Sequence, residues 1–180
     1  MEDLDKLFRT AERNLNDALK HYEEVRDGKP LEFVGLKLQS CIFQFDICSE
    51  MIGLVRNQPN GFALSVALKG LILRLFEYDQ LIKRHWIPQL LSLAEKRGLK
   101  SAKNAIRDLR KTWKCDLAVI QDWSAVRSKA AAHYTKDVAS QVALLKNINH
   151  SEVLNVAQAF LSYNLNLLVH LQNVGYGHDA

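Results

Sequence analysis

The sequence predicts an all-α fold, an antiparallel up-and-down bundle of four long helices with short extra helices. Apolar residues recur at alternating spacings of three and four, as on one face of an α-helix. No segment shows the strict alternation of a strand, and the connections are short, which favours antiparallel neighbours. Of the 180 residues, 48% are hydrophobic and only 3 are proline, so the chain is not disordered.

Each of the first three long helices is expected from an apolar stripe that ends at a turn signal. Gly28 and Pro30 end the first stripe, because neither residue continues a helix readily. The run Asn-Gln-Pro-Asn-Gly ends the second stripe. The stripes span residues 4–25, 34–55 and 64–82.

Shorter helices are expected in the middle of the chain. Pro88 begins one that ends near Gly98, and Ser101 is the expected N-cap of the next. The stripe continues past Trp113, so we expect this helix to run toward His133.

The C-terminal part of the chain carries two further helix starts. A short helix is expected from about Asp137. Asn149 with Glu152 three residues later resembles a capping box, and it begins a last helix that is apolar over a wide arc and therefore central. The expected domain covers residues 1–174, with a flexible tail at 175–180.

The charge is concentrated in one block of the chain. The whole sequence has a net charge of +4, but residues 83–114 contain 10 basic and 2 acidic residues. Such a patch attracts a polyanion, and RNA is the expected partner; the alternative is a solvated helix face. The expected RNA-binding residues are Lys100, Lys103, Arg107, Arg110, Lys111 and Lys114.

The sequence gives no indication of a secretory signal, a membrane span, a metal site or a cofactor site. The acidic start is unlike a secretory signal, and the apolar stretch 62–76 is too short to span a membrane and contains charged residues. Cys41 and Cys48 read as buried thiols, which suits the cytoplasm. No zinc-ligand cluster, phosphate-binding loop or cofactor motif is present, so neither a metal nor a cofactor is expected.

One segment, residues 123–137, stands out for its chemistry. On the expected helix Arg127 lies on the apolar stripe, where a guanidinium needs a carboxylate, a carbonyl or an anion. The simplest explanation is a structural ion pair, for example to Asp46 or Glu77. Three alanines follow Arg127 and allow another helix or chain to approach closely, which makes a twofold homodimer natural. His133 is too far around a straight helix to share one tight site with Arg127.

The run Arg-Ser-Lys-Ala-Ala-Ala-His-Tyr, residues 127–134, resembles the arginine-x(4–6)-histidine motif of the HEPN superfamily. The placement is also similar, because the motif lies late in a helical chain and precedes one long C-terminal helix. The resemblance implies a dimeric, metal-independent endoribonuclease of toxin or defence type. It also implies that Arg127 stabilises the scissile phosphate and that His133 acts as general acid–base, while Ser128, Lys129 and Tyr134 support them.

The sequence leaves three hypotheses open. The first is this ribonuclease, which uses attack of the RNA 2′-OH on the phosphate. The second is a non-catalytic HEPN-like module that binds RNA or a nucleotide and acts with a partner protein, such as an antitoxin or a nucleotidyltransferase. The third is a plain helical dimer in which Arg127 only forms an ion pair.

Overall fold

The structure, a computed structural model, describes residues 2–25, 31–131 and 136–178. The described residues are almost entirely helical and contain no strand, so the all-α prediction is confirmed. The four longest helices have 24, 27, 21 and 27 residues. They are α1 (Glu2–Val25), α2 (Leu31–Asn57), α3 (Gly61–Leu81) and α8 (His150–Tyr176).

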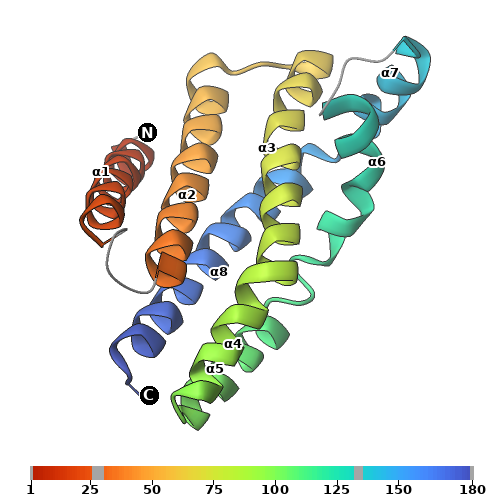
Figure 1. The fold of residues 1–180 in the computed structure, drawn as a ribbon. Helices are drawn as coiled ribbons and strands as arrows, with labels where there is room; N and C mark the ends of the chain where they lie inside the picture. The colour runs from red at the N-terminus through yellow and green to blue at the C-terminus, as the bar shows by residue number, and fades with distance from the viewer. Residues whose placement is uncertain (1, 26–30, 132–135, 179–180) are drawn as a thin grey trace.

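The long helices surround a core to which α8 contributes most. Helix α1 packs along α2, and α8 runs obliquely behind α2 and α3 (Figure 1). The expectation that the last helix is central is confirmed, because α8 contacts α2, α3, α4 and α5. The fully buried Phe160 of α8 contacts Phe43 edge-on and Tyr78 at a tilt. The rings of Phe43 and Tyr78 stack on each other with their centroids 4.1 Å apart.

A buried polar network joins three of the long helices. The Tyr78 hydroxyl of α3 lies 2.7 Å from the Ser40 Oγ of α2 and donates to the Asn164 Oδ1 of α8 at 3.0 Å. Asn164 also donates to the Ser40 carbonyl at 3.2 Å. Because each of these buried groups has a partner, the network fixes the relative positions of the helices without an unpaired polar group.

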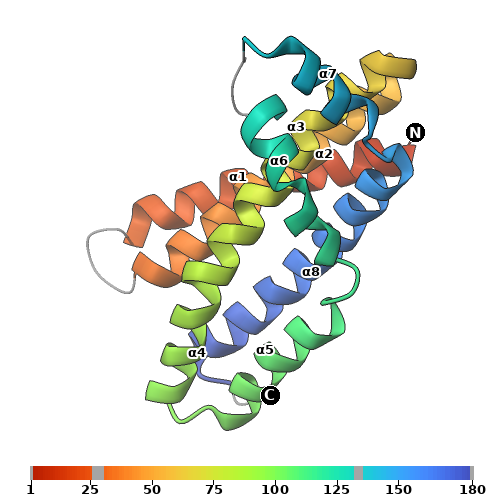
Figure 2. The same cartoon turned by 90° about the vertical axis from the view of Figure 1, so that its right-hand side faces the viewer.

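In the described part of the chain, seven shorter elements lie between α3 and α8, and Figure 2 shows α5 beside α8. Two of them are π-helical turns and one is a 3₁₀ helix. In order they are η1 (Ile82–Trp86), α4 (Ile87–Lys96), α5 (Lys100–Thr112), η2 (Ala118–Trp123), α6 (Ser124–Val126), η3 (Arg127–Ala131) and α7 (Val138–Lys146).

Helix starts agree with the sequence at the C-terminal end of the chain and differ in the middle. Asp137 caps α7 by accepting from the Ser140 amide at 3.0 Å, and Asn149 caps α8 by accepting from the Glu152 amide at 3.3 Å. The N-cap of α5 is Leu99, so Ser101 lies inside the first turn. Pro88 does not open a new helix either, because the π turn η1 joins α3 to α4 without a break.

The prediction of one continuous helix from residue 101 toward His133 is wrong. Helix α5 ends at Thr112, and the chain then follows a turn, the 3₁₀ helix η2, one turn of α-helix and the π turn η3. The buried residues in this segment follow the spacing of about three that a 3₁₀ helix gives. They are Leu117, Ile120, Trp123, Val126 and Ala130. Arg127 therefore lies beside the buried line and not on it.

The end of α8 lies slightly beyond the expected domain boundary. The helix continues to Tyr176, and Gly177 caps it with the left-handed φ of 76° that glycine adopts easily. Arg97 donates to the carbonyls of Val174 and Gly175 at 2.6 and 2.8 Å, so the first residues of the expected tail are fixed in the last turn.

Among the described residues, one segment of α2, Phe33–Asn57, is long and apolar enough to cross a membrane by length and composition alone. Its mean hydropathy is 1.2, and 44% of its most apolar window is buried inside the protein. Within α2, Cys41 and Cys48 are buried free thiols, as predicted.

Candidate nucleic-acid interface

A cavity of about 620 Å³ opens between α5, the turn that follows it, α3 and α8. The basic block predicted from the sequence supplies most of its charge. Five cationic side chains line it, and the only acid in the lining is Asp79. The five are Lys83, Arg107, Arg110, Lys111 and Lys114.

The helical spacing of α5 explains why these cations gather at one place. Positions 107, 110, 111 and 114 follow the spacings of three and four that bring side chains to one face of a helix. The opposite face of α5 is apolar and buried through Ala102, Ile106 and Leu109, against α8 among others. The burial of one face therefore turns the basic face outward to the cavity.

The cations differ in whether an acid already neutralises them. Lys83 pairs with Asp79 at 2.8 Å, and Lys111 pairs with Asp108 at 2.9 Å. Arg107, Arg110 and Lys114 are exposed, and they form no side-chain hydrogen bond or ion pair with any residue that the structure describes. These three residues, which we call the free cations, are available to an anionic ligand.

The inner end of the cavity, which we call the floor, is formed by two deeply buried polar side chains. Asp79 of α3 is 3% exposed and Tyr163 of α8 is 5% exposed. The Asp79 Oδ2 accepts from both the Lys83 Nζ and the Gln121 Nε2 at 2.8 Å. Gln121 is held in turn by the Gln80 amide at 3.3 Å, so its orientation toward Asp79 is fixed from both ends.

Burial sets the protonation chemistry of the floor. It raises the pKa of Asp79 above its ordinary value of 3.8, although hydrogen bonds from Lys83 and Gln121 and the charge of Arg110 oppose the shift. Burial also raises the pKa of Tyr163 to about 12, so its hydroxyl is a neutral donor and acceptor at physiological pH. The nearby Arg110 opposes this second shift, which shows that a free cation lies close to the floor.

The cavity wall is apolar and includes an aromatic ring. Trp113 is the C-cap of α5 and is half-buried, and Leu117 and Ala118 continue the wall in the following turn. Indole rings stack on nucleobases without strong sequence preference. Proteins that bind single-stranded nucleic acids without sequence preference combine a positively charged groove with such aromatic side chains.

Arg127 forms an ion pair with Glu77 of α3, one of the two acids anticipated for a structural pair. The side chains of Arg127 and Glu77 are 40% and 49% exposed. An exposed pair of this kind contributes only about 0–1 kcal/mol to stability. The guanidinium is thus reachable from solvent and is held by a partner that a phosphate could displace.

Arg127 lies near the cavity because both are attached to the same stretch of α3. Glu77 binds Arg127, and Gln80, three residues later, binds Gln121 at the cavity. Three residues of α-helix rise by about 4.5 Å, less than one turn. Arg127 is therefore held within one turn of α3 of Gln80, which contacts the cavity residue Gln121.

The structure describes only some of the other residues of the HEPN-like motif. Ser128 and Lys129 are exposed, and the Ser128 hydroxyl donates weakly to the Ala125 carbonyl at 3.4 Å. His133 and Tyr134 lie outside the described residues. Ala130 is 1% exposed, so the first of the three alanines already packs within its own chain.

The predicted RNA-binding residues separate into two groups. Four of the six line the cavity, whereas Lys100 and Lys103 do not. Lys103 is engaged with Glu95 at 2.8 Å, and Lys100 is exposed. The sequence did not identify the residues of the floor and the wall as binding residues; these are Asp79, Trp113, Gln121 and Tyr163. Asp79 and Lys83 at spacing four were the one signal available for them.

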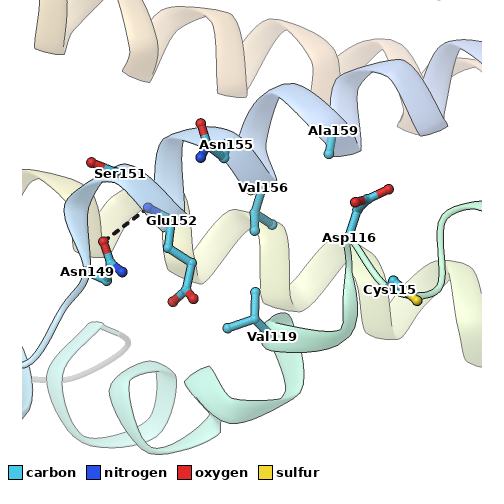
Figure 3. A pocket seen from close by; sticks show the side chains of 9 residues that line it. All are labelled: Cys115, Asp116, Val119, Asn149, Ser151, Glu152, Asn155, Val156 and Ala159. Carbon is cyan, nitrogen blue, oxygen red and sulfur yellow. Dashed lines mark hydrogen bonds between the residues drawn. The ribbon is translucent and has the colours of Figure 1, made fainter.

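A second hollow, of about 410 Å³, lies beside the first and has the opposite charge. The turn after α5 separates the two, because Trp113, Lys114, Leu117 and Ala118 line the first whereas Cys115 and Asp116 line the second. Figure 3 shows the second hollow between this turn and the start of α8, where Glu152 points toward Val119. Its lining contains two acids and no lysine or arginine, so of these two hollows the basic cavity is the one that suits an anionic ligand.

Among the residues that the structure describes, no group of three or more histidine, cysteine, aspartate or glutamate side chains could hold a metal ion. Neither a family model, nor a curated protein, nor a solved structure matches this chain.

Proposed function

We propose that this protein binds RNA through the basic cavity, as the non-catalytic HEPN-like module among the alternatives. The observation that carries the proposal is the association of the free cations Arg107, Arg110 and Lys114 with the Trp113 ring in one opening of about 620 Å³. Backbone phosphates would meet the cations, and a base would lie against the ring. A merely solvated helix face does not need an aromatic wall or a cavity.

The experiment is a binding titration with fluorescent single-stranded RNA at low salt. The Arg110→Glu variant reverses one free cation and should weaken binding at least tenfold. The matched control is Arg13→Glu, which makes the same charge change on the exposed surface of α1, away from the cavity. If the two variants bind equally, the cavity is not the RNA site. If the unmodified protein binds no RNA at low salt, the plain helical dimer is the better hypothesis.

The second candidate is the metal-independent endoribonuclease that the motif resemblance implies. It is favoured by the half-exposed Arg127, which is held by Glu77, less than one turn of α3 from Gln80, and a phosphate could replace this acid. In this candidate Arg127 stabilises charge on the scissile phosphate. His133 moves the proton of the attacking 2′-OH, and the products carry a 2′,3′-cyclic phosphate and a 5′-hydroxyl.

RNA cleavage in the presence of EDTA tests the second candidate. Arg127→Ala and His133→Ala should each abolish cleavage while circular dichroism remains that of a folded helical protein. Glu77→Gln is the informative control, because it frees Arg127 without removing it, and cleavage should persist. Full activity in either alanine variant would exclude the catalytic assignment and leave the binding module.

The same proposal includes the remaining expectations about the assembly. The long helices form an up-and-down bundle, and the protein acts in the cytoplasm as a homodimer. An antitoxin or a nucleotidyltransferase is the partner class that the resemblance implies. Sedimentation of the protein alone tests the dimer, since a monomer at micromolar concentration would contradict it.

A further inference from the structure

The cavity floor offers hydrogen-bonding atoms that the protein itself does not use. Both protein hydrogen bonds to Asp79 are made by its Oδ2, so its Oδ1 has no hydrogen-bond partner among the described residues. The Tyr163 hydroxyl also has none within the described part of the chain, although the residue is 5% exposed. Neither atom is among the fully buried, unpaired polar atoms of the described residues, so both reach the open space of the cavity and are available to a ligand there.

The surroundings of the floor define the chemistry of this ligand. The free cations at the rim require an anionic group, and the wall of Trp113 and Leu117 requires a flat, apolar face. A carboxylate accepts hydrogen bonds and cannot donate them, so the end of the ligand nearest Asp79 must carry N–H groups. The volume of about 620 Å³ falls in the range of small-molecule sites.

We propose that the cavity selects a guanine nucleotide, as a unit of the RNA that the protein binds. Its phosphate meets Arg107, Arg110 and Lys114, and its base lies against Trp113. The guanine N1–H and N2 amine donate to the Asp79 carboxylate, and the Tyr163 hydroxyl donates to O6. This inference rests on the proposed RNA-binding function and adds a base preference to it.

Guanine fits the floor better than the other three bases because of the order of its polar atoms. Its edge presents an acceptor and then two neighbouring donors, which matches one hydroxyl beside one carboxylate. Adenine and cytosine present an acceptor ring nitrogen where Asp79 needs a donor. Uracil has one suitable N–H, but its O2 oxygen would face the carboxylate and repel it.

Two neighbours act as positioning residues for the carboxylate. Lys83 and Gln121 both bond to Oδ2, which fixes the side chain and leaves Oδ1 without a partner among the described residues. Lys83 also supplies a charge that favours the ionised, hydrogen-bond-accepting form of Asp79. The floor is therefore arranged before the ligand arrives, which reduces the ordering cost of binding.

Calorimetric titration of the full chain with four mononucleotides tests the selection directly. GMP should bind about tenfold or more tightly than AMP and UMP, since a good two-point contact with a base discriminates by this amount. IMP lacks only the N2 amine and should be intermediate. The 1-methyl derivative of GMP lacks the N1–H and should lose the preference, a result that needs no protein variant.

Variants then assign the preference to the floor. Asp79→Asn should reduce the ratio of GMP to AMP affinity to near one without weakening AMP. Tyr163→Phe should weaken GMP several-fold. Asp46→Asn, which removes a surface carboxylate paired with Arg74, is the matched control and should leave the ratio unchanged.

The outcomes separate this inference from the proposed function. Equal affinity for GMP and AMP, in a protein that still binds RNA at low salt, would overturn the base selection alone. A GMP preference that survives Asp79→Asn in a folded variant would also overturn it. Absence of binding to both mononucleotides and RNA would overturn the proposed function together with the inference.

Discussion

The salt dependence of RNA binding can be worked out from the free cations. Arg107, Arg110 and Lys114 have no acidic partner among the described residues, whereas Lys83 and Lys111 are already neutralised. Each cation that contacts a phosphate of single-stranded RNA releases condensed counterions and contributes about 0.7 to the slope of log affinity against log salt. Three such contacts give a slope of about −2.

This slope corresponds to a roughly 20-fold loss of affinity between 50 and 200 mM salt. Arg110→Gln should reduce the slope by about 0.7, so the loss falls to roughly sevenfold. Replacement of all three free cations by glutamine should bring the slope close to zero. Fluorescence anisotropy with a single-stranded 12-mer RNA that contains guanosine, repeated at four salt concentrations, measures each value.

The control must match the change in total charge. A variant with glutamine at Lys6, Arg13 and Lys20 removes three exposed cations from α1, which packs on α2 away from the cavity. Its slope should remain about −2. A slope that stays near this value in the cavity variant, or falls equally in both variants, would refute the assignment of phosphate contacts to the free cations.

Three further predictions concern stability. Tyr78→Phe removes two buried hydrogen bonds and should lower the free energy of unfolding by about 1–3 kcal/mol in urea denaturation, and an unchanged midpoint would contradict the network. Phe160→Ala empties a fully buried aromatic site and should cost about 3–5 kcal/mol in the same assay. Because burial raises the pKa of Asp79, the stability from this group is fully present below pH 3.8 and is lost as pH rises through the raised pKa. Asp79→Asn avoids this loss, so its stability relative to the unmodified protein should rise as the pH increases above 3.8, and a constant difference would exclude the shift.

Most helices could be predicted from the sequence because their apolar stripes are long and regular. The stripes of α1, α2 and α3 each exceed five turns, so one ambiguous residue does not change the result. The segment after Thr112 has no apolar stripe of this length. A stripe through Ser124 and Arg127 fitted spacings of three and four, but the chain instead buries Trp123 and Val126 at spacings of three.

The cavity could be predicted only in part. Its cations are close together in the sequence, whereas the residues of its floor are far apart. Arg107, Arg110 and Lys114 are neighbours on the chain, so their shared face was visible from spacing alone. Asp79 and Tyr163 lie 84 positions apart, and only the packing of α3 against α8 brings them to one opening. No short-range pattern contains this information.

The buried acid is the feature that distinguishes this cavity from a simple phosphate site. A negative charge beneath the rim weakens the attraction of Arg110 and its neighbours for phosphate. Burial also makes the ionised form of Asp79 costly, so the residue improves neither phosphate affinity nor stability at neutral pH. A ligand can offset both effects if its N–H groups donate hydrogen bonds to the carboxylate while its phosphate binds the cations at the rim. The combination therefore argues for recognition of a base as well as of the RNA backbone.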